Sequence, residues 1–243
     1  MSRLSLLKHV EVVLVRPTHP GNMGAVARAM HNMGLSRLVL VAPASDPLGP
    51  EARAMAHRSF HLLEAARVVA SLGEAVGHCG LVVGTTGKKP RRQPRPVDVR
   101  AAAPEILAYG ERNRVALVFG PEATGLTTAE MALCHRLVTV PAAPENPSLN
   151  LAQAVLLVGY ELRRAAQEEG PAPKRALASA RELEGFYEHM ARVLLEIGFL
   201  KPPADAAAFR ALRRIFSRAD LSAREVRMLR GIFRQVQWAL RNR

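Results

Sequence analysis

Two segments of the sequence carry polar side chains in positions suited to chemistry, and each follows an apolar run. In RPTHPGNMGAVARAMHNMG, Pro20 and the glycine after it make a turn, Asn22 can cap a helix, and Arg28 lies on that helix. In PENPSLNLAQAV, prolines stiffen a loop that brings Ser148 and Asn150 to the start of an apolar helix. The first segment could also be a packed turn with a surface arginine, and Ser148 could be a plain helix cap.

Two further segments offer backbone-rich loops. VVGTTGKKPRRQPRP combines small residues with five basic ones and no acidic one, a composition that suits a flat or anionic ligand and a nucleic-acid contact. The basic residues of this arm are Lys88, Lys89, Arg91, Arg92 and Arg95. VALVFGPEATGLT ends an apolar run at Gly120 and places Glu122 before a Thr-capped helix. An ordinary polar loop remains an alternative for the basic arm.

Other enzyme classes find little support in the sequence. No Walker P-loop, GxSxG elbow or HExxH motif is present, and no GxGxxG opens a helix after a strand. His57 and His61 have the nearest metal-like spacing but lack a third ligand nearby, so we expect no metal site. The chemistry must therefore come from a bound cosubstrate.

The elements that position these segments alternate between short apolar runs and helical patterns, which is typical of a parallel sheet covered by helices. Strands are predicted over residues 10–15, 37–42, 80–85, 114–120 and 136–140. Helices are predicted over 23–33, 51–64 with a break, 104–109, 128–134 and 151–167. All four segments follow a predicted strand, where ligand-binding loops lie in open parallel sheets.

The last quarter of the chain differs from the rest. We predict an α/β domain over 1–168, a linker over 169–176 rich in Gly and Pro, and a small all-α domain over 177–243. The chain carries a formal net charge of +13, and residues 174–243 hold a net +8 of it. Arginines at three- and four-residue steps form basic stripes suited to a phosphate backbone, or else solvated helix faces. These are Arg210, Arg213, Arg214, Arg218, Arg224, Arg227, Arg230 and Arg234.

Composition also bounds the compartment. No apolar run approaches the ~18 to 20 residues of a membrane span, and the N-terminal segment lacks the layout of a signal peptide. Cys79 and Cys134 are too few and too far apart for a disulfide framework. We expect a cytoplasmic protein that does not contact membranes.

Three of these motifs together resemble the SPOUT methyltransferases, which have a deep trefoil knot: GNMGAVARAMHNMG, LVFGPEATGLT and PSLNLAQAV. The resemblance implies a SPOUT-type knotted parallel sheet flanked by helices. It also implies S-adenosylmethionine as methyl donor, with S-adenosylhomocysteine as product, and a homodimer whose second subunit completes each active site. The helix over 151–162 and the first-motif helix would form the interface. The donor pocket would be lined by Thr85, Thr86, Gly87, Gly120, Val140, Ser148 and Leu149.

More narrowly, the chain resembles the SPOUT enzymes that methylate the ribose 2'-oxygen of cytidine or uridine 32 in the tRNA anticodon loop. Their C-terminal extension looks like LEGFYEHMARVLLEIGFL, LRRIFSRA and EVRMLRGIFRQV here. This implies tRNA as partner, bound by Lys88, Lys89, Arg91, Arg92, Arg210, Arg213, Arg214 and Arg227. A related ribosomal RNA methyltransferase and a non-catalytic RNA-binding protein are the alternatives.

The resemblance also implies roles for the polar residues. We expect Arg28 to hold the target phosphate and stabilise developing alkoxide charge, because a guanidinium with a pKa above about 12 is a poor base. Ser148, Asn150 or the phosphate itself would relay the proton. Asn22 and Glu122 would hold Arg28 and the motif loops in place.

Overall fold

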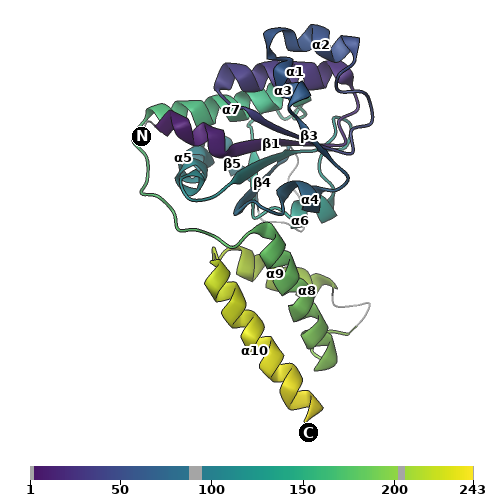
Figure 1. The fold of residues 1–243 in the computed structure, drawn as a ribbon, viewed down its shortest axis with the longest axis vertical. Helices are drawn as coiled ribbons and strands as arrows, with labels where there is room; N and C mark the ends of the chain where they lie inside the picture. The colour runs from purple at the N-terminus through teal and green to yellow at the C-terminus, as the bar shows by residue number, and fades with distance from the viewer. Residues whose placement is uncertain (1–2, 88–94, 202–205, 243) are drawn as a thin grey trace.

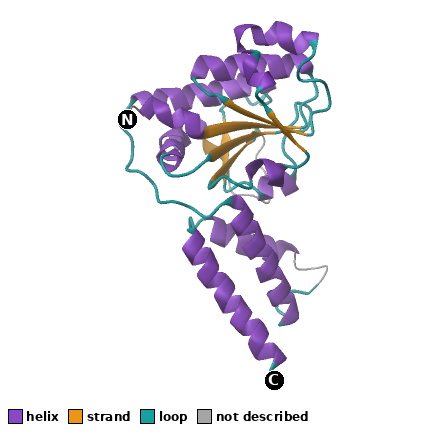
Figure 2. Ribbon diagram, in the orientation of Figure 1, coloured by secondary structure: helices purple, strands orange, loops and turns teal. Residues whose placement is uncertain are grey.

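A seven-stranded parallel sheet forms the centre of the larger part of the molecule (Figures 1 and 2). The computed structural model describes residues 3–87, 95–201 and 206–242. The strand order is β3-β2-β1-β6-β4-β7-β5, and every neighbouring pair is parallel. The strands are β1 (Val10–Val15), β2 (Arg37–Val41), β3 (Arg67–Val69), β4 (Leu81–Thr85), β5 (Val97–Asp98), β6 (Val115–Phe119) and β7 (Arg136–Thr139).

Helices cover both faces of this sheet, which explains why its central strands are apolar throughout. Alternate residues of β1 enter different cores: Val12 and Leu14 face one, and Val13 and Val15 the other. The first face carries η1 (Arg3–His9), α1 (Pro20–Met33), α2 (Pro50–Ala56), η2 (His57–Ser59), α3 (His61–Glu64), α5 (Val99–Gly110) and α7 (Leu151–Gln167). The second carries α4 (Leu72–Val76) and α6 (Thr128–Ala132).

The predicted strands and most predicted helices are confirmed, but four short elements were missed. These are η1, β3, α4 and β5. The helix expected over 104–109 begins earlier, at Val99, because Asp98 caps it by accepting a hydrogen bond from the Arg100 amide at 2.8 Å. Pro104 lies inside that helix rather than at its start. Proline favours the first helical turn, yet this helix begins five residues before Pro104.

Three helices form the C-terminal unit, which packs around its own aromatic core. They are α8 (Ala180–Glu196), α9 (Ala206–Ser217) and α10 (Ala223–Arg241). Phe186 of α8 is fully buried, and its ring centroid lies 5.0 Å from that of Phe216 and 6.0 Å from that of Phe233. One side chain thus connects all three helices. In Figure 1 the unit lies below the sheet, and α10 extends away from it.

The connection from α7 to α8 follows the sheet domain as an extended segment (Figure 1). Buried Asn113 fixes it: its amide group donates to the carbonyl of Arg175 at 3.2 Å, and its oxygen accepts from the Leu177 amide at 2.8 Å. The first turn of α8 then meets the end of α4. The amides of Ala180 and Arg181 donate to the carbonyls of Cys79 and Gly77, at 2.8 and 3.0 Å. Backbone bonds therefore join the two units.

No helix among residues 3–87, 95–201 and 206–242 is long and apolar enough to cross a membrane.

Candidate active site

A cavity of about 670 Å³ opens at the carboxyl ends of β6, β4 and β7, which are adjacent in the sheet. Ligands of open parallel sheets bind at this edge, and the volume is typical of a small-molecule site. Leu151, Ala154 and Val158 of α7 form an apolar wall. All seven residues expected to bind the methyl donor line the cavity: Thr85, Thr86, Gly87, Gly120, Val140, Ser148 and Leu149.

Small residues let the loops of this cavity approach one another. A Cβ added to Gly120 would lie 2.3 Å from the carbonyl carbon of Gly125 and from the amide nitrogen of Leu126. A Cβ on Gly87 would lie 2.8 Å from the carbonyl oxygen of Pro147. Real Cβ atoms do not come so close to backbone, so only glycine fits at these two positions. At these two positions, therefore, backbone rather than side chain borders the cavity.

A chain of hydrogen bonds joins three of the predicted catalytic residues beside the cavity. The side-chain amide of Asn150 donates to Asn22 Oδ1 at 3.0 Å, and that of Asn22 donates to Glu122 Oε1 at 2.8 Å. The hydroxyl of Thr18 donates to Glu122 Oε2 at 2.9 Å. These residues come from the start of α1, the start of α7 and the loop after β6, so the chain ties three motif segments together.

The expected helix cap at Asn22 is wrong, and the alternative of a plain cap at Ser148 is excluded. Asn22 does not cap α1, because the helix begins at Pro20 and His19 precedes it as the cap residue. Asn150, rather than Ser148, caps α7 through a capping box with Gln153. Its oxygen accepts from the amides of Ala152 and Gln153, at 2.9 and 3.4 Å, so its NH₂ group must point to Asn22. The cap thus fixes the direction of the whole chain.

Glu122 ends this chain as a carboxylate. Burial alone would raise its pKa, but hydrogen bonds from Asn22, from its own amide and from Thr18 outweigh that effect and hold the pKa below the ordinary value. A carboxylate with a lowered pKa is a poor proton acceptor near neutral pH. Its place in the site is to hold Asn22.

Arg28 and Ser148 lie apart from the hydrogen-bonded chain. Arg28 is exposed on α1, six residues beyond Asn22 and hence about 9 Å further along the helix axis. Within the described part of the chain its side chain makes no hydrogen bond or ion pair, and it does not line the cavity. Ser148 is exposed and lines the cavity. The chain thus brings Asn22, Glu122 and Asn150 together but leaves Arg28 apart from them.

The expected RNA-binding residues fall into different environments. Lys88, Lys89, Arg91 and Arg92 lie outside the described residues. Arg227 is exposed on α10, whereas Arg214 is partly buried on α9. Arg213 makes a forked ion pair with Glu184, donates to the carbonyl of Ala132 and stacks on the Tyr187 ring. Arg210 reaches the wall of the cavity.

Sequence reasoning missed two contributors to the site's edge. Thr18 was passed over because a single threonine in a Pro-rich turn carries no periodic signal. Arg16, which has a positive φ of 47°, pairs with Glu130 in the capping box of α6. Burial opposes ionisation of Glu130, yet the hydrogen bond from Arg16 helps to hold its pKa below the usual range. The positive φ of a non-glycine residue was the structural feature that marked this turn, and sequence does not show it.

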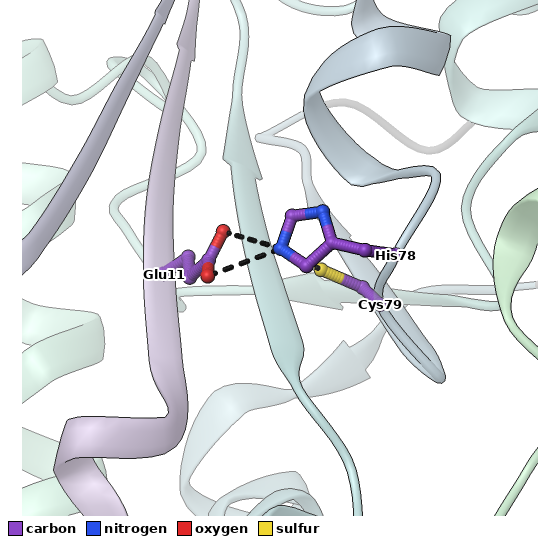
Figure 3. A group of neighbouring side chains, drawn as sticks. All are labelled: Glu11, His78 and Cys79. Atoms are coloured by element: carbon purple, nitrogen blue, oxygen red, sulfur yellow. Dashed lines mark hydrogen bonds and ion pairs between the residues drawn. The ribbon is translucent and has the colours of Figure 1, made fainter. Parts of the chain in front are cut away.

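A third group lies away from the cavity, at the amino end of the strands, where Glu11, His78 and Cys79 meet (Figure 3). Nε2 of His78 lies 3.1 and 3.0 Å from the two oxygens of buried Glu11 and 3.7 Å from the sulfur of Cys79. Burial and the Glu11 charge raise the pKa of Cys79 to about 12. Since the thiolate is the metal-binding form, we interpret the group as a hydrogen-bonded His–Glu pair beside a protonated thiol.

Comparison with known proteins gives the same assignment for both parts of the chain. The model of the SpoU rRNA Methylase family matches residues 9–160, and that of the tRNA methyltransferase TrmJ, C-terminal domain, matches residues 181–243. The tRNA (cytidine/uridine/adenosine-2'-O-)-methyltransferase TrmJ of Pseudomonas aeruginosa is 43% identical over 96% of this chain and 95% of its own.

Solved structures agree. The crystal structure of TrmJ from Z. mobilis covers 93% of this chain and 98% of its own, with a TM-score of 0.80 and 36% identity. The SpoU methyltransferase AviRb from Streptomyces viridochromogenes, solved in complex with the cofactor AdoMet, has a TM-score of 0.52 and 29% identity over 63% of this chain and 59% of its own. The expected α/β SPOUT-type fold with a C-terminal all-α part is confirmed. The chain belongs to the SpoU methylase family and, within it, to the TrmJ-type tRNA methyltransferases.

Proposed function

We propose that this protein transfers a methyl group from S-adenosylmethionine to a ribose 2'-oxygen of tRNA. The observation that carries the proposal is the cavity at the ends of β6, β4 and β7, bordered by the oriented chain Asn150, Asn22 and Glu122. TrmJ relatives named as tRNA 2'-O-methyltransferases match nearly the whole chain. By resemblance, we place the target at nucleotide 32 of the anticodon loop, and the reaction in the cytoplasm.

The residues of the cavity suit the methyl donor. Gly120 and Gly87 leave room that a Cβ would fill, so backbone amides and carbonyls can meet a flat adenine ring. We assign donor binding to Thr85, Thr86, Gly87, Gly120, Val140, Ser148 and Leu149. When bound, the donor supplies an electrophilic methyl group on a sulfonium.

The chain's own residues prepare the attacking oxygen. Ionised Glu122 fixes Asn22, and the α7 cap fixes Asn150, so both amides lie in set orientations beside the cavity. The Arg28 guanidinium holds the target phosphate and stabilises negative charge that develops on the 2'-oxygen. The phosphate itself, directly or through the Ser148 hydroxyl as a relay, takes the proton from the 2'-hydroxyl, because Arg28 is too weak a base to do so. Asn150 was the third candidate for this step, but its oxygen already accepts the amides of Ala152 and Gln153 and its NH₂ group donates to Asn22.

The Arg28 side chain does not line the cavity of its own chain. A homodimer would bring Arg28 of one subunit to the cavity of the other. α7 exposes Leu156, Leu157 and Tyr160, whose side chains are 37%, 39% and 51% accessible. Residues of this size in a row on one helix suit burial against a second copy. We propose that α7 and α1 form the dimer interface, and that Arg28 of the partner subunit completes each site.

Methyl transfer to transcribed tRNAs, with the modified nucleotide located by mass spectrometry, tests the proposal. We expect a 2'-O-methyl group at nucleotide 32 and none without the methyl donor. Modification of ribosomal RNA alone would favour the related rRNA enzyme. Calorimetry separates the remaining alternative, since a non-catalytic RNA-binding protein would give no heat with the methyl donor.

A further inference from the structure

A second pocket, of about 360 Å³, lies where α9 faces the sheet edge formed by β7 and β5. Half of its lining residues are arginines from both parts of the chain: Arg95, Arg136, Arg210, Arg213, Arg214 and Arg218. Arg210 and Arg214 lie four residues apart and therefore share one side of α9, and Arg218 follows directly after the end of that helix. We call this the arginine pocket. No acidic residue of the described chain lines it.

The pocket's positive charge is only partly compensated. Asp220 pairs with Arg136 at 2.9 Å, and Glu184 pairs with Arg213, so two of the arginines are neutralised within the protein. Arg95, Arg210 and Arg218 have no acidic partner within residues 3–87, 95–201 and 206–242. Like charges held together across an interface repel one another, and the apolar surface of Val97 and Leu137 beside them strengthens their field.

We propose that the arginine pocket binds backbone phosphates of the tRNA and guides the target nucleotide into the neighbouring methyl-donor cavity. An arginine fork matches a phosphate in geometry as well as charge. Arg210 lines both cavities, so the two sites are continuous. Three cations supplied by two parts of the chain suit a series of phosphates, whereas the carboxylate of the methyl donor would need one of them.

This inference rests on the proposed function, because the RNA is the substrate of that reaction. It adds that the C-terminal unit acts at the edge of the active site. The carboxylate of the methyl donor is the other anion that the arginine pocket could bind. The experiment distinguishes binding of this carboxylate from binding of tRNA phosphates.

The test compares the double variant Arg95→Gln, Arg218→Gln with Arg192→Gln, an exposed arginine of α8 outside the pocket. Both mutated arginines are exposed, so thermal melting should be unchanged. Binding of tRNA is measured by fluorescence anisotropy at several salt concentrations. In the double variant we expect the Kd to rise roughly tenfold and the salt slope to fall by about 1 to 2, since each lost phosphate contact releases fewer counterions. Arg192→Gln should leave both quantities near wild type.

Equal loss in the control and the double variant, or wild-type binding in both, would overturn the proposal. A further variant, Arg210→Gln, separates the anions. Weaker tRNA binding with an unchanged calorimetric Kd for the methyl donor supports a phosphate site; weaker donor binding with unchanged tRNA binding would assign the pocket to the donor. If wild type binds tRNA without methylating it, the proposed function fails while these binding measurements still decide the role of the pocket.

Discussion

The carboxyl edge of the sheet and the C-terminal unit are built in different ways. At the sheet edge, every residue of β1 and β6 is buried, and the polar groups beside the cavity hold one another through oriented hydrogen bonds. Among the described residues of the C-terminal unit, α9 has no buried residue and α10 has only Val226. Besides the backbone bonds at the start of α8, the Arg136–Asp220 ion pair and the bond from Arg213 to the Ala132 carbonyl hold this unit to the sheet domain.

This difference indicates that residue positions are fixed more tightly at the sheet edge than in the C-terminal unit. Burial and close packing fix positions tightly, because voids and clashes are both costly in a dense interior. Partly exposed ion pairs contribute less and tolerate small shifts. We therefore expect methyl transfer to depend steeply on the sheet edge, and RNA binding to depend in a graded way on the C-terminal unit.

The largest expected effect would come from Arg28→Lys, which keeps the charge but removes the planar fork. We expect kcat to fall roughly 100- to 1,000-fold, as when one preorganised donor is lost, with tRNA affinity little changed. Single-turnover methyl transfer and anisotropy would measure the two quantities. Near-normal turnover with unchanged RNA binding would contradict the role assigned to Arg28.

Gly120→Ala should act next most strongly, through packing alone. Its Cβ would clash with backbone at 2.3 Å, so the loop after β6 must shift, and we expect donor affinity to fall roughly tenfold to a hundredfold. Gly73→Ala is the matched control, because a Cβ there meets nothing within 4 Å and the residue lies in α4. The control should bind the donor normally and stabilise the protein slightly. Normal donor binding by Gly120→Ala would show that the cavity is less rigid than we infer.

Glu122→Gln would test the fixed orientation of the hydrogen-bonded chain. We expect about a tenfold loss in kcat, because Asn22 can then turn away. The lowered pKa of Glu122 also predicts a pH signature. Stability that the ionised form provides is present above the unfolded pKa and is lost as pH falls through the folded pKa.

The difference in free energy of unfolding between wild type and Glu122→Gln should therefore be greatest at neutral pH, shrink as pH falls below the ordinary glutamate pKa, and vanish once pH lies below the lowered pKa of Glu122 in the folded protein. It should stay within about 1 kcal/mol, because the side chain is partly exposed. Urea unfolding at a series of pH values measures it. A difference that grows as pH falls would contradict the assigned ionisation.

Asp220→Asn should have the smallest effect and sharpen the contrast between the two regions. Asp220 pairs with Arg136 and accepts a hydrogen bond from Tyr109, so its loss should cost about 1 kcal/mol. Glu168→Gln, which removes an exposed pair with Arg164, should cost less. We expect kcat at saturating tRNA to stay near wild type. A loss as large as that of Glu122→Gln would show that docking of the C-terminal unit sets the catalytic geometry.

Much of the fold followed from the sequence because its central strands are long, apolar runs buried on both faces. The misses were short elements that periodicity cannot separate from loops. β3 has three residues, with Val68 57% exposed, and β5 has two. The early start of α5 was hidden by Pro104, whose usual place is a helix start.

The sequence predicted which residues make up the site, but not how hydrogen bonds join them. Asn22, Glu122 and Asn150 were identified as residues of one site, yet the order of their hydrogen bonds depends on Asn150 being the α7 cap. From the sequence, Arg213 was likewise expected to bind tRNA, as were Arg210 and Arg214. Only the three-dimensional structure shows that its guanidinium pairs with Glu184 and stacks on the Tyr187 ring.

The joint between α4 and α8 has a consequence for solvent exchange. A helix start leaves backbone amides without partners inside the helix. Here the amide of Ser179 donates to the Glu182 carboxylate, that of Glu182 donates to the Ser179 hydroxyl, and those of Ala180 and Arg181 reach the carbonyls of Cys79 and Gly77. These four amides sit at a boundary between two units, where exchange with water is usually fast. All four should instead be protected. Those of Ala180 and Arg181, whose partners lie on the sheet domain, should lose protection together when the C-terminal unit detaches from the sheet, whereas the two amides of the capping box within α8 should keep theirs.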